Sequence, residues 1–346
     1  MSDEAGALRA EHTLPRPDPA EDPEPHTVSL LDEPDDTYVQ AGATTPEDLQ
    51  ALAPRVTQAV RNTVEEADPS LDNDLAMWWR EDSALPKLHL LGPVRATTRG
   101  KPLTKRKPYM TELLAFIALR RLGATPEEVA QTFNITKAKA RDYVLTIRHW
   151  LGTNPRTSEY HLPDARLAPA AKVREVPVYQ VTDLLIDADL FRRLRVRGEA
   201  RGGPEGIEDL RTALRLVDGR PFDYPVEREH GGGWTWLLEG DRLDEHLTVA
   251  IVDVAHLLVT HDLADGNLPA ARLAAETAIL AAPHEEIPRL DLAAVADAEG
   301  KQAEAQRIIR DDVCNRSDDE SAPPELPTRT EQILRNRKGW TDTKAS

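Results

Sequence analysis

Apolar residues recur at helical spacing from residue 45 onward, whereas residues 1–44 show no such period. Proline alternates with acidic residues in this first stretch, and its large apolar side chains are too few to offset the entropy of ordering. We therefore expect residues 1–44 to form a disordered, acidic and proline-rich tail. An aliphatic stripe then predicts an amphipathic helix: Leu49, Leu52, Val56, Val60 and Val64. Because one isolated helix is marginally stable, residues 45–86 are predicted to be a helical linker that packs on the next domain.

Between residues 87 and 121 the pattern changes from that of a strand to that of a helix. The apolar run at 87–94 contains Gly92-Pro93 near its end, which is typical of a strand followed by a turn. Residues 100–103 are its expected hairpin partner. A denser apolar set at 108–121 predicts a buried helix.

Two further helix starts follow this buried helix. Thr125 and Glu128 have the spacing of a capping box and predict a short helix. Thr136 is the expected cap of a longer, basic helix that runs to Leu151 and ends at Gly152. A helix, a short capped helix, a tight turn and a longer basic helix are the order of a helix-turn-helix.

The fold class follows from what surrounds this unit. Residues 158–162 and 176–181 are plausible strands for the hairpin of a winged form. Beyond residue 182 the apolar pattern predicts helices on short Gly- or Pro-containing loops, at 187–200, 204–217, 242–261, 268–282, 285–298 and 302–313. Small residues within 266–283 are spaced as in a tetratricopeptide-type helix pair.

The prediction is therefore a mainly α protein with two folded parts. A winged helix-turn-helix (α+β) DNA-binding domain spans 87–181, and an all-α, tetratricopeptide-like domain of helical hairpins spans 182–313. Residues 314–346 are expected to be a polar C-terminal tail.

The net charge of the chain is distributed unevenly along the sequence. The formal net charge of −17 argues by itself against a nucleic-acid or membrane-surface protein. However, residues 87–156 hold 14 Lys+Arg and 4 Asp+Glu, a net charge of +10, between flanks of −15 and −12. A basic island of this kind indicates a local polyanionic partner.

The third helix of the predicted unit supplies most of the candidate contacts. A helical projection places Ala138, Arg141, Asp142 and Leu145 opposite its apolar stripe, where they would face base edges in a major groove. Further candidate contacts, chiefly with phosphates, are Lys137, Lys139, Arg148, Arg156, Lys105 and Arg106. The alternative is an ordinary solvated surface, and Asp142 counts against DNA because its carboxylate repels phosphate. The cluster that holds Lys105 and Arg106 is equally compatible with a backbone-contacting arm and with plain surface.

The order of these segments resembles a known family of bacterial regulators. KLHLLGPVRA, LLAFIALRRLGATPEEVAQTF, TKAKARDYVLTIRHWLG and SEYHL are similar to the OmpR-type winged helix of the Streptomyces antibiotic regulatory protein family. The stretches that begin with VTDLLIDADLF and RLDEHLTVAIV resemble the bacterial transcriptional activation domain (BTAD), in the form found at the C-terminus of lysin-motif proteins. The resemblance implies a regulator that binds double-stranded DNA. Its helical half would self-associate as a homodimer or contact RNA polymerase subunits.

Other functional classes find little support in the sequence. The stretch His230–Trp234 is similar to an esterase oxyanion loop, but no serine lies in a Gly-x-Ser-x-Gly frame, and no phosphate-binding or zinc-protease motif is present. We therefore expect no enzyme activity, cofactor or metal. Cys314 is the single cysteine, which excludes an internal disulfide.

No uncharged apolar run reaches 18 residues, and the N-terminus lacks the pattern of a secretory signal. We therefore expect a soluble, cytoplasmic protein without a membrane span. Two functions remain open: a sequence-specific DNA-binding transcriptional regulator, and a protein-interaction scaffold whose winged helix no longer binds DNA.

Overall fold

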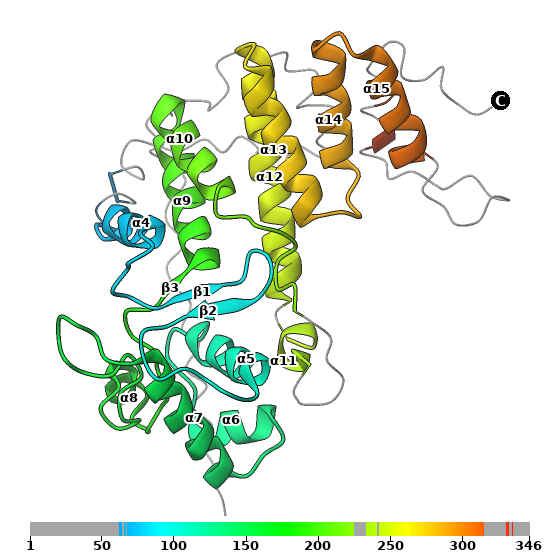
Figure 1. Cartoon of the computed structure of the whole chain (residues 1–346). Coiled ribbons are helices and arrows are strands. Elements are labelled where there is room, and N and C mark those ends of the chain that lie inside the picture. The colour runs from blue at the N-terminus through cyan, green and yellow to red at the C-terminus, as the bar shows by residue number, and fades with distance from the viewer. Residues whose placement is uncertain are drawn as a thin grey trace, which may run out of the picture.

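The computed structural model describes residues 62–63, 66, 68–224, 233–240, 242–314, 330–331 and 334, and these form a mainly helical protein with one small sheet (Figure 1). The tail predicted at 1–44 and the aliphatic stripe of the predicted linker lie outside the described residues. The last part of that linker forms α4 (Leu71–Trp79), which buries Leu71, Leu75 and Trp78. The Lys87 ammonium donates to the carbonyls of Trp78 and Arg80, each at 2.6 Å, so it satisfies C-terminal acceptors of α4 and joins this helix to the sheet.

The sheet has three short strands in the order β2-β1-β3. β1 (Lys87–His89) pairs antiparallel with β2 (Arg95–Thr97) and parallel with β3 (Leu185–Ile186), which arrives from almost a hundred residues later. The prediction that residues 100–103 would pair with the first strand was wrong. The turn at Gly92 brings 95–97 back onto β1. Gly100 instead lies so close to the carbonyl of His149 that an added Cβ would be 2.1 Å from its oxygen.

Three helices follow the sheet in the predicted order. They are α5 (Lys107–Ala118), α6 (Pro126–Thr132) and α7 (Lys137–Leu151). The hairpin predicted after them does not form a ladder among the described residues, although the chain after its second segment returns to the first, where the Thr182 N–H donates to the His161 carbonyl at 2.8 Å. Tyr160 bridges to Thr153, and Tyr179 bridges to Ala124 just before α6. The segment between them contains a helix that the sequence analysis missed, α8 (Pro169–Arg174).

The second half is a stack of helical hairpins (Figure 1). Its elements are α9 (Asp187–Arg201), α10 (Gly203–Leu214), α11 (Thr235–Leu238), α12 (Leu243–Ala264), α13 (Leu268–Ala281), α14 (Ile287–Ala298), α15 (Gln302–Arg307) and the π-helical turn η1 (Ile308–Cys314). α9 packs on α10, α12 on α13, and α14 on α15, while α10 and α14 both contact α12. All six predicted helices exist here, and α11 and β3 are additions.

Small residues allow these hairpins to close tightly. The buried face of α13 consists entirely of alanine: Ala271, Ala274, Ala275, Ala278 and Ala281. At Gly198 of α9, an added Cβ would meet the Gly206 carbonyl oxygen of α10 at 2.9 Å. Helix axes approach closely where side chains end at Cβ, so the small-residue spacing found in the sequence has a direct packing role.

The buried core continues across the boundary predicted at residue 181. Asp187, the first residue of α9, is buried, and its carboxylate accepts the N–H groups of Leu90 at 2.8 Å and Leu91 at 3.1 Å. Burial raises the pKa of Asp187 to about 7, against the opposite effect of its N–H donors. From the other side, the Phe222 N–H donates to the Leu90 carbonyl at 2.7 Å. The sheet and the first helical hairpin therefore share one hydrophobic cluster.

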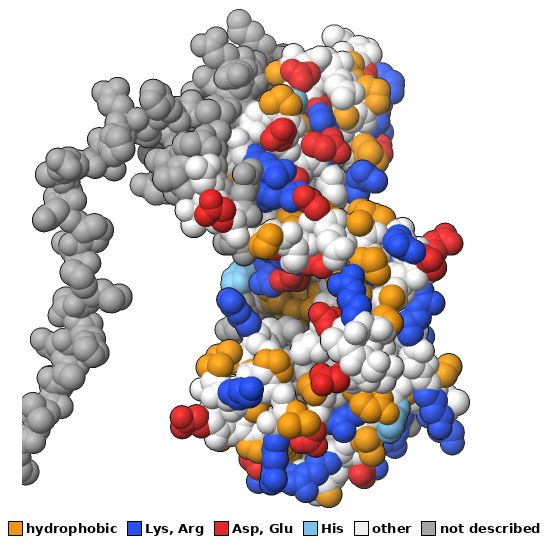
Figure 2. Space-filling view, turned by 90° about the vertical axis from the view of Figure 1, so that its left-hand side faces the viewer, with side chains coloured by type: hydrophobic (Ala, Val, Ile, Leu, Met, Phe, Trp, Pro, Cys, Tyr) orange, Lys and Arg blue, Asp and Glu red, His pale blue; other side chains and the backbone are white. Residues whose placement is uncertain are grey.

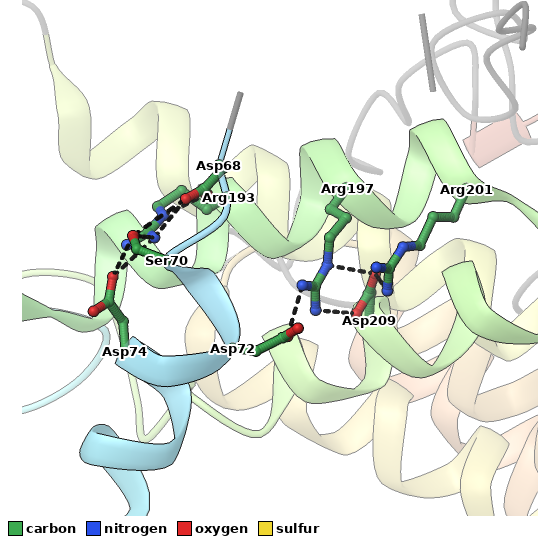
Figure 3. A network of polar contacts seen from close by, with 8 residues as sticks. All are labelled: Asp68, Ser70, Asp72, Asp74, Arg193, Arg197, Arg201 and Asp209. Atoms are coloured by element: carbon green, nitrogen blue, oxygen red, sulfur yellow. Dashed lines mark hydrogen bonds and ion pairs between the residues drawn. The ribbon is translucent and has the colours of Figure 1, made fainter. Parts of the chain in front are cut away.

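Arginines of α9 connect α4 and α10 through a polar network (Figure 3). Arg193 donates to Asp68 at 2.7 Å and to Asp74 at 2.9 Å. Arg197 donates to Asp209 on α10 at 2.7 Å and to Asp72 on α4 at 2.7 Å, and Arg201 also reaches Asp209. The network ties the predicted linker to the helical half.

Polar residues inside the helical half also form pairs. Asp253, which interrupts the apolar run of α12, lies 3.5 Å from the Arg195 guanidinium. His256 and Asp291, both fully buried, are 2.8 Å apart. Within the described residues α12 alone is long and apolar enough to cross a membrane, but it packs among α10, α13 and α14.

Part of the C-terminal tail belongs to the fold. Thr330 and Leu334 are buried, and Leu334 joins the cluster formed around Ile287 and Leu290 of α14. The Thr330 hydroxyl donates to the Glu286 carboxylate at the start of that helix. At these described positions the predicted polar tail at 314–346 packs on the fold.

Candidate nucleic-acid interface

Local hydrogen bonds build the start of α6. The Thr125 hydroxyl accepts the Glu128 N–H at 3.1 Å, and the Glu128 carboxylate accepts the Thr125 N–H at 2.7 Å. This reciprocal capping box confirms the predicted helix start. The same Glu128 carboxylate also accepts a hydrogen bond from Arg174 of α8.

The turn between α6 and α7 is equally well determined. Asn134 has φ of 47°, in the left-handed region that asparagine tolerates better than most residues. The Ile135 N–H donates to the Ala130 carbonyl at 2.9 Å, which is one of the bonds of a Schellman motif. Thr136 then caps α7, because its hydroxyl accepts a backbone N–H from the first turn at 3.2 Å. The turn thereby sets the direction in which α7 leaves α6.

α7 has one buried face and one exposed face, as its periodicity predicts. The buried residues are Ala140, Val144, Ile147, Trp150 and Leu151. The opposite side, here called the α7 face, consists of exposed Ala138, Lys139, Arg141, Asp142 and Leu145. Leu145 on this side is 47% exposed. All predicted base-edge residues therefore lie together at the surface.

The cations of the α7 face make few contacts within the protein, and the one that is seen is between the Lys139 ammonium and the Tyr143 ring. Among the described residues, neither Lys139 nor Arg141 forms an ion pair. Lys137 does pair with Glu127 of α6, at 2.5 Å, and this contact lowers the pKa of Glu127. Both side chains of that pair are more than half exposed, so the pair contributes little stability and Lys137 is available to another anion. Figure 2 shows Lys and Arg side chains gathered at the lower end of the molecule, where α6 and α7 lie in Figure 1.

Arg148 does not belong to this set. Its guanidinium donates to the carbonyl of Leu162 at 2.7 Å and to that of Pro163 at 2.9 Å. The position of Arg148 on the helix turns its side chain toward the chain segment that follows α7. The contacts hold that segment against the helix, so Arg148 has a structural role, and the phosphate contact stays a prediction.

The basic cluster before α5 flanks α7 on another side. Arg106 donates to the Tyr143 hydroxyl of α7 at 2.5 Å, and the Lys139 ammonium lies 4.9 Å from the centre of the same ring. The Lys101 N–H donates to the His149 carbonyl at 2.8 Å, which fixes the base of this loop. The structure therefore brings exposed Lys105 and Arg106 beside α7.

A short loop holds Arg156 near the other end of α7. The His161 N–H donates to the Gly152 carbonyl at 3.1 Å, so residues 152–161 fold back on themselves. Arg156 is exposed on this loop, and Tyr160 packs edge-on against the exposed ring of His149, with centroids 5.7 Å apart. His149 was not among the predicted contacts, although its helical position places it on the same side as Leu145.

Three further basic residues of the island contact other parts of the fold. Arg99 donates to the carbonyls of Ser83 and Glu81, and Arg95 pairs with Asp218 at 3.1 Å. The Arg120 guanidinium lies 3.5 Å from the centre of the Phe116 ring. The net charge of +10 therefore overstates the charge available to a ligand.

The segment after α7 is fastened to α6 by side chains. Arg174 of α8 donates to Glu128, the capping residue of α6, at 2.8 Å and to the Gly123 carbonyl at 3.2 Å. The Gln180 amide connects the N–H of Ala170 with the carbonyl of Arg121. α8 is thus held beside the helix-turn-helix unit in the place where a wing was predicted.

Aromatic contacts connect α7 with the helical half. Consecutive ring centroids lie 5.3–5.6 Å apart along the series Tyr143, Tyr109, Phe133, Phe116, Trp236, Trp234 and Tyr224. Beside this series, buried Glu112 of α5 accepts the Trp234 N–H at 2.8 Å, and burial raises the pKa of Glu112. α7 is therefore mounted on a body that includes α11.

The described residues contain no group of three or more His, Cys, Asp or Glu side chains placed to hold a metal ion. No family model and no curated protein matches the chain. Among solved structures, the chain is similar to EmbR from Mycobacterium tuberculosis, solved in complex with a low-affinity phosphopeptide. That likeness has 19% sequence identity and a TM-score of 0.44, over 75% of this chain and 68% of that one.

Proposed function

We propose that this protein is a sequence-specific, double-stranded DNA-binding transcriptional regulator that inserts α7 into a major groove. The observation that carries the proposal is the α7 face: exposed Lys139 and Arg141 form no ion pair among the described residues, on a helix whose other side is fully packed. A capped turn of four residues, 133–136, holds this helix at a defined angle to α6.

Each exposed side chain then has a distinct role. Arg141 reads a guanine edge, Leu145 contacts a thymine methyl group, and Asp142 accepts from a cytosine amino group. Lys137 and Lys139 lie at phosphates, with Lys105 and Arg106 on one flank of the groove and Arg156 near the end of the helix. α8 replaces the wing of the predicted winged helix-turn-helix domain, and the protein works in the cytoplasm, where it reaches the chromosome. The helical half serves self-association or contact with RNA polymerase.

Selection of bound duplexes from a random library, followed by anisotropy titrations at several salt concentrations, tests the proposal. Counterion release predicts a linear fall of log affinity with log salt. Lys139→Ala with Arg141→Ala removes one phosphate contact and one base contact. We expect the affinity to fall by about 10- to 100-fold, which corresponds to the loss of roughly 1–3 kcal/mol at a base contact.

A matched double variant changes the net charge equally at a distance from α7. Arg192→Ala with Lys301→Ala removes two exposed cations of the helical half and is expected to leave the affinity unchanged within about twofold. Equal losses in both variants would reduce the α7 face to a general charge effect. Failure to select any duplex, together with recovery of a stoichiometric protein from nuclease-treated lysate, would favour the scaffold function instead.

A further inference from the structure

Arg106, directly before α5, has an unusual backbone conformation. Its φ of 55° and ψ of 32° lie in the left-handed region, which an arginine rarely adopts. A strained residue of this kind persists only where its surroundings hold it, and such residues cluster at functional sites. The conformation therefore directs attention to what the Arg106 side chain contacts.

Arg242 gives a direct comparison, because it is an arginine in the same cap position before α12, with φ of 46° and ψ of 48°. Its guanidinium pairs with Asp244 at 3.2 Å and with Glu245 at 2.5 Å, both in the first turn of that helix. The first turn of α5 has no acidic residue. Arg106 instead donates to the neutral hydroxyl of Tyr143 on α7, at 2.5 Å. Within the described residues its guanidinium therefore has no carboxylate partner.

A second cation contacts the same ring. Lys139 lies one turn before Tyr143 on α7, and its ammonium is 4.9 Å from the ring centre. Lys139 is exposed and forms no ion pair in the described part of the chain, whereas the nearby Lys137 pairs with Glu127. Two cations from distant segments thus meet at one tyrosine, where they repel each other until an anion joins them.

The Tyr143 ring is itself held in place by packing. It lies edge-on to Tyr109 of α5, with centroids 5.4 Å apart, and Tyr109 lies edge-on to Phe133 with centroids 5.6 Å apart. The phenol is therefore a defined point of contact for both cations.

The surroundings of this pair are basic. Four exposed cations and no carboxylate stand at 101–107: Lys101, Lys105, Arg106 and Lys107. Asp142, next to Tyr143 in the chain, is the one exposed carboxylate at 137–145. A guanidinium donates as a planar fork and an ammonium acts as a point charge, so together they suit an anion with several acceptor oxygens. Phosphate groups have this chemistry.

We propose that Tyr143 positions Arg106 and Lys139 as one clamp for neighbouring phosphates of a single DNA strand. Tyr143 is then a positioning residue, because it acts through the two cations. That the phosphates belong to DNA rests on the proposed function, whereas the anion site itself does not.

Anisotropy titrations of the full chain with a selected duplex test the clamp. Arg106→Gly should weaken binding about three- to tenfold for every sequence and lower the salt slope by about one, as loss of a phosphate contact does. Since glycine accepts a positive φ, this change should not lower the urea midpoint. Arg242→Gly makes the same replacement in the same backbone conformation, and it should leave the affinity unchanged within about twofold.

A double-mutant cycle isolates the role of Tyr143. Tyr143→Phe keeps the ring for Lys139 but removes the hydroxyl that accepts from Arg106. We expect it to weaken duplex binding about threefold in the native chain and to have no further effect in Arg106→Gly. Fully additive losses would overturn the positioning role.

Inorganic pyrophosphate tests the anion site without DNA. It should raise the thermal midpoint of the native chain and of Arg242→Gly, and the rise should be at least halved in Arg106→Gly and in Lys139→Ala. Equal rises in all four proteins, with equal duplex affinity in Arg106→Gly and the native chain, would overturn the clamp and leave the proposed function standing. A rise that depends on both cations, in a chain that binds no duplex, would overturn the proposed function and leave the anion site standing.

Discussion

The arginines of α9 and the cations of α7 show two uses of the same charge. On α9, the Arg197 side chain is 10% exposed and bonds to Asp209, which is 9% exposed, and to Asp72. On α7, Lys139 and Arg141 are exposed and form no ion pair among the described residues. Residue type and net charge do not distinguish these cases. The difference is that Arg197 has the Asp209 carboxylate within hydrogen-bond distance, whereas no carboxylate among the described residues lies that close to Lys139 or Arg141.

The comparison explains why the overall charge was a poor guide to partners. In the helical half, the acidic excess includes carboxylates that are already committed to arginines, such as Asp209 with Arg197 and Glu299 with Arg272. In the basic island, several cations are committed to backbone carbonyls or aromatic rings. A ligand contacts the charged side chains that are not already paired within the fold. We expect the most basic group of these side chains on and around the α7 face.

The largest expected effect on stability comes from breaking the buried ion pair between Arg197 and Asp209. Asp209→Ala leaves the buried Arg197 guanidinium with only the exposed Asp72 carboxylate. Removing one partner of a buried pair typically costs about 3–5 kcal/mol, so we expect a clear fall in the urea midpoint. Arg192→Ala, at an exposed pair with Asp189, should change the unfolding free energy by less than about 1 kcal/mol. Similar losses in the two variants would remove the distinction between the two uses of charge.

Arg148 shares features with both the structural arginines of α9 and the exposed cations of α7. It lies on α7, yet it donates to two backbone carbonyls as a structural arginine would. Arg148→Ala should lower the unfolding free energy by about 1.5–3 kcal/mol, since charged hydrogen bonds are lost. The salt dependence of DNA binding should keep its slope. A slope reduced by about one, with unchanged stability, would return Arg148 to the phosphate contacts.

His89 offers a smaller effect that depends on pH. Its ring packs on Trp78 of α4 with centroids 4.6 Å apart, and burial lowers the pKa of His89 from 6.5 to about 4. Since the unfolded chain binds the proton more readily, this group makes the fold less stable as pH falls from about 6.5 toward 4. Urea midpoints at pH 7 and pH 4.5 should differ less in His89→Phe than in the native chain. An equal difference would show that other groups carry the pH dependence.

The smallest expected effect on stability is at the α7 face. Lys139→Ala with Arg141→Ala should change the unfolding free energy by no more than about 0.5 kcal/mol, because neither charge supports the fold. Thermal and urea unfolding of the variant measure this directly. A loss above 1 kcal/mol would mean that the α7 face is structural, and any fall in DNA affinity would then need another explanation.

Local signals in the sequence predicted the helix-turn-helix unit closely. The Thr125 and Thr136 caps and the end of α7 at Gly152 lie where they were expected, since each depends on residues within one or two turns. The wing failed because strand pairing is not local: Tyr179 found its partner at Ala124, more than fifty residues earlier. The carbonyl contacts of Arg148 were missed for the same reason, since a helical projection gives a direction and not the neighbour in that direction.

The sequence by itself therefore determined the helices, their caps, the buried side of α7 and the separation of charge along the chain. These features depend on short-range periodicity and on residue chemistry. Only the tertiary structure decided which cations remain exposed and uncommitted, because that depends on carboxylates and carbonyls brought in from distant segments. It also decided that α8, fastened by Arg148 and Arg174, lies beside α7 in place of a hairpin.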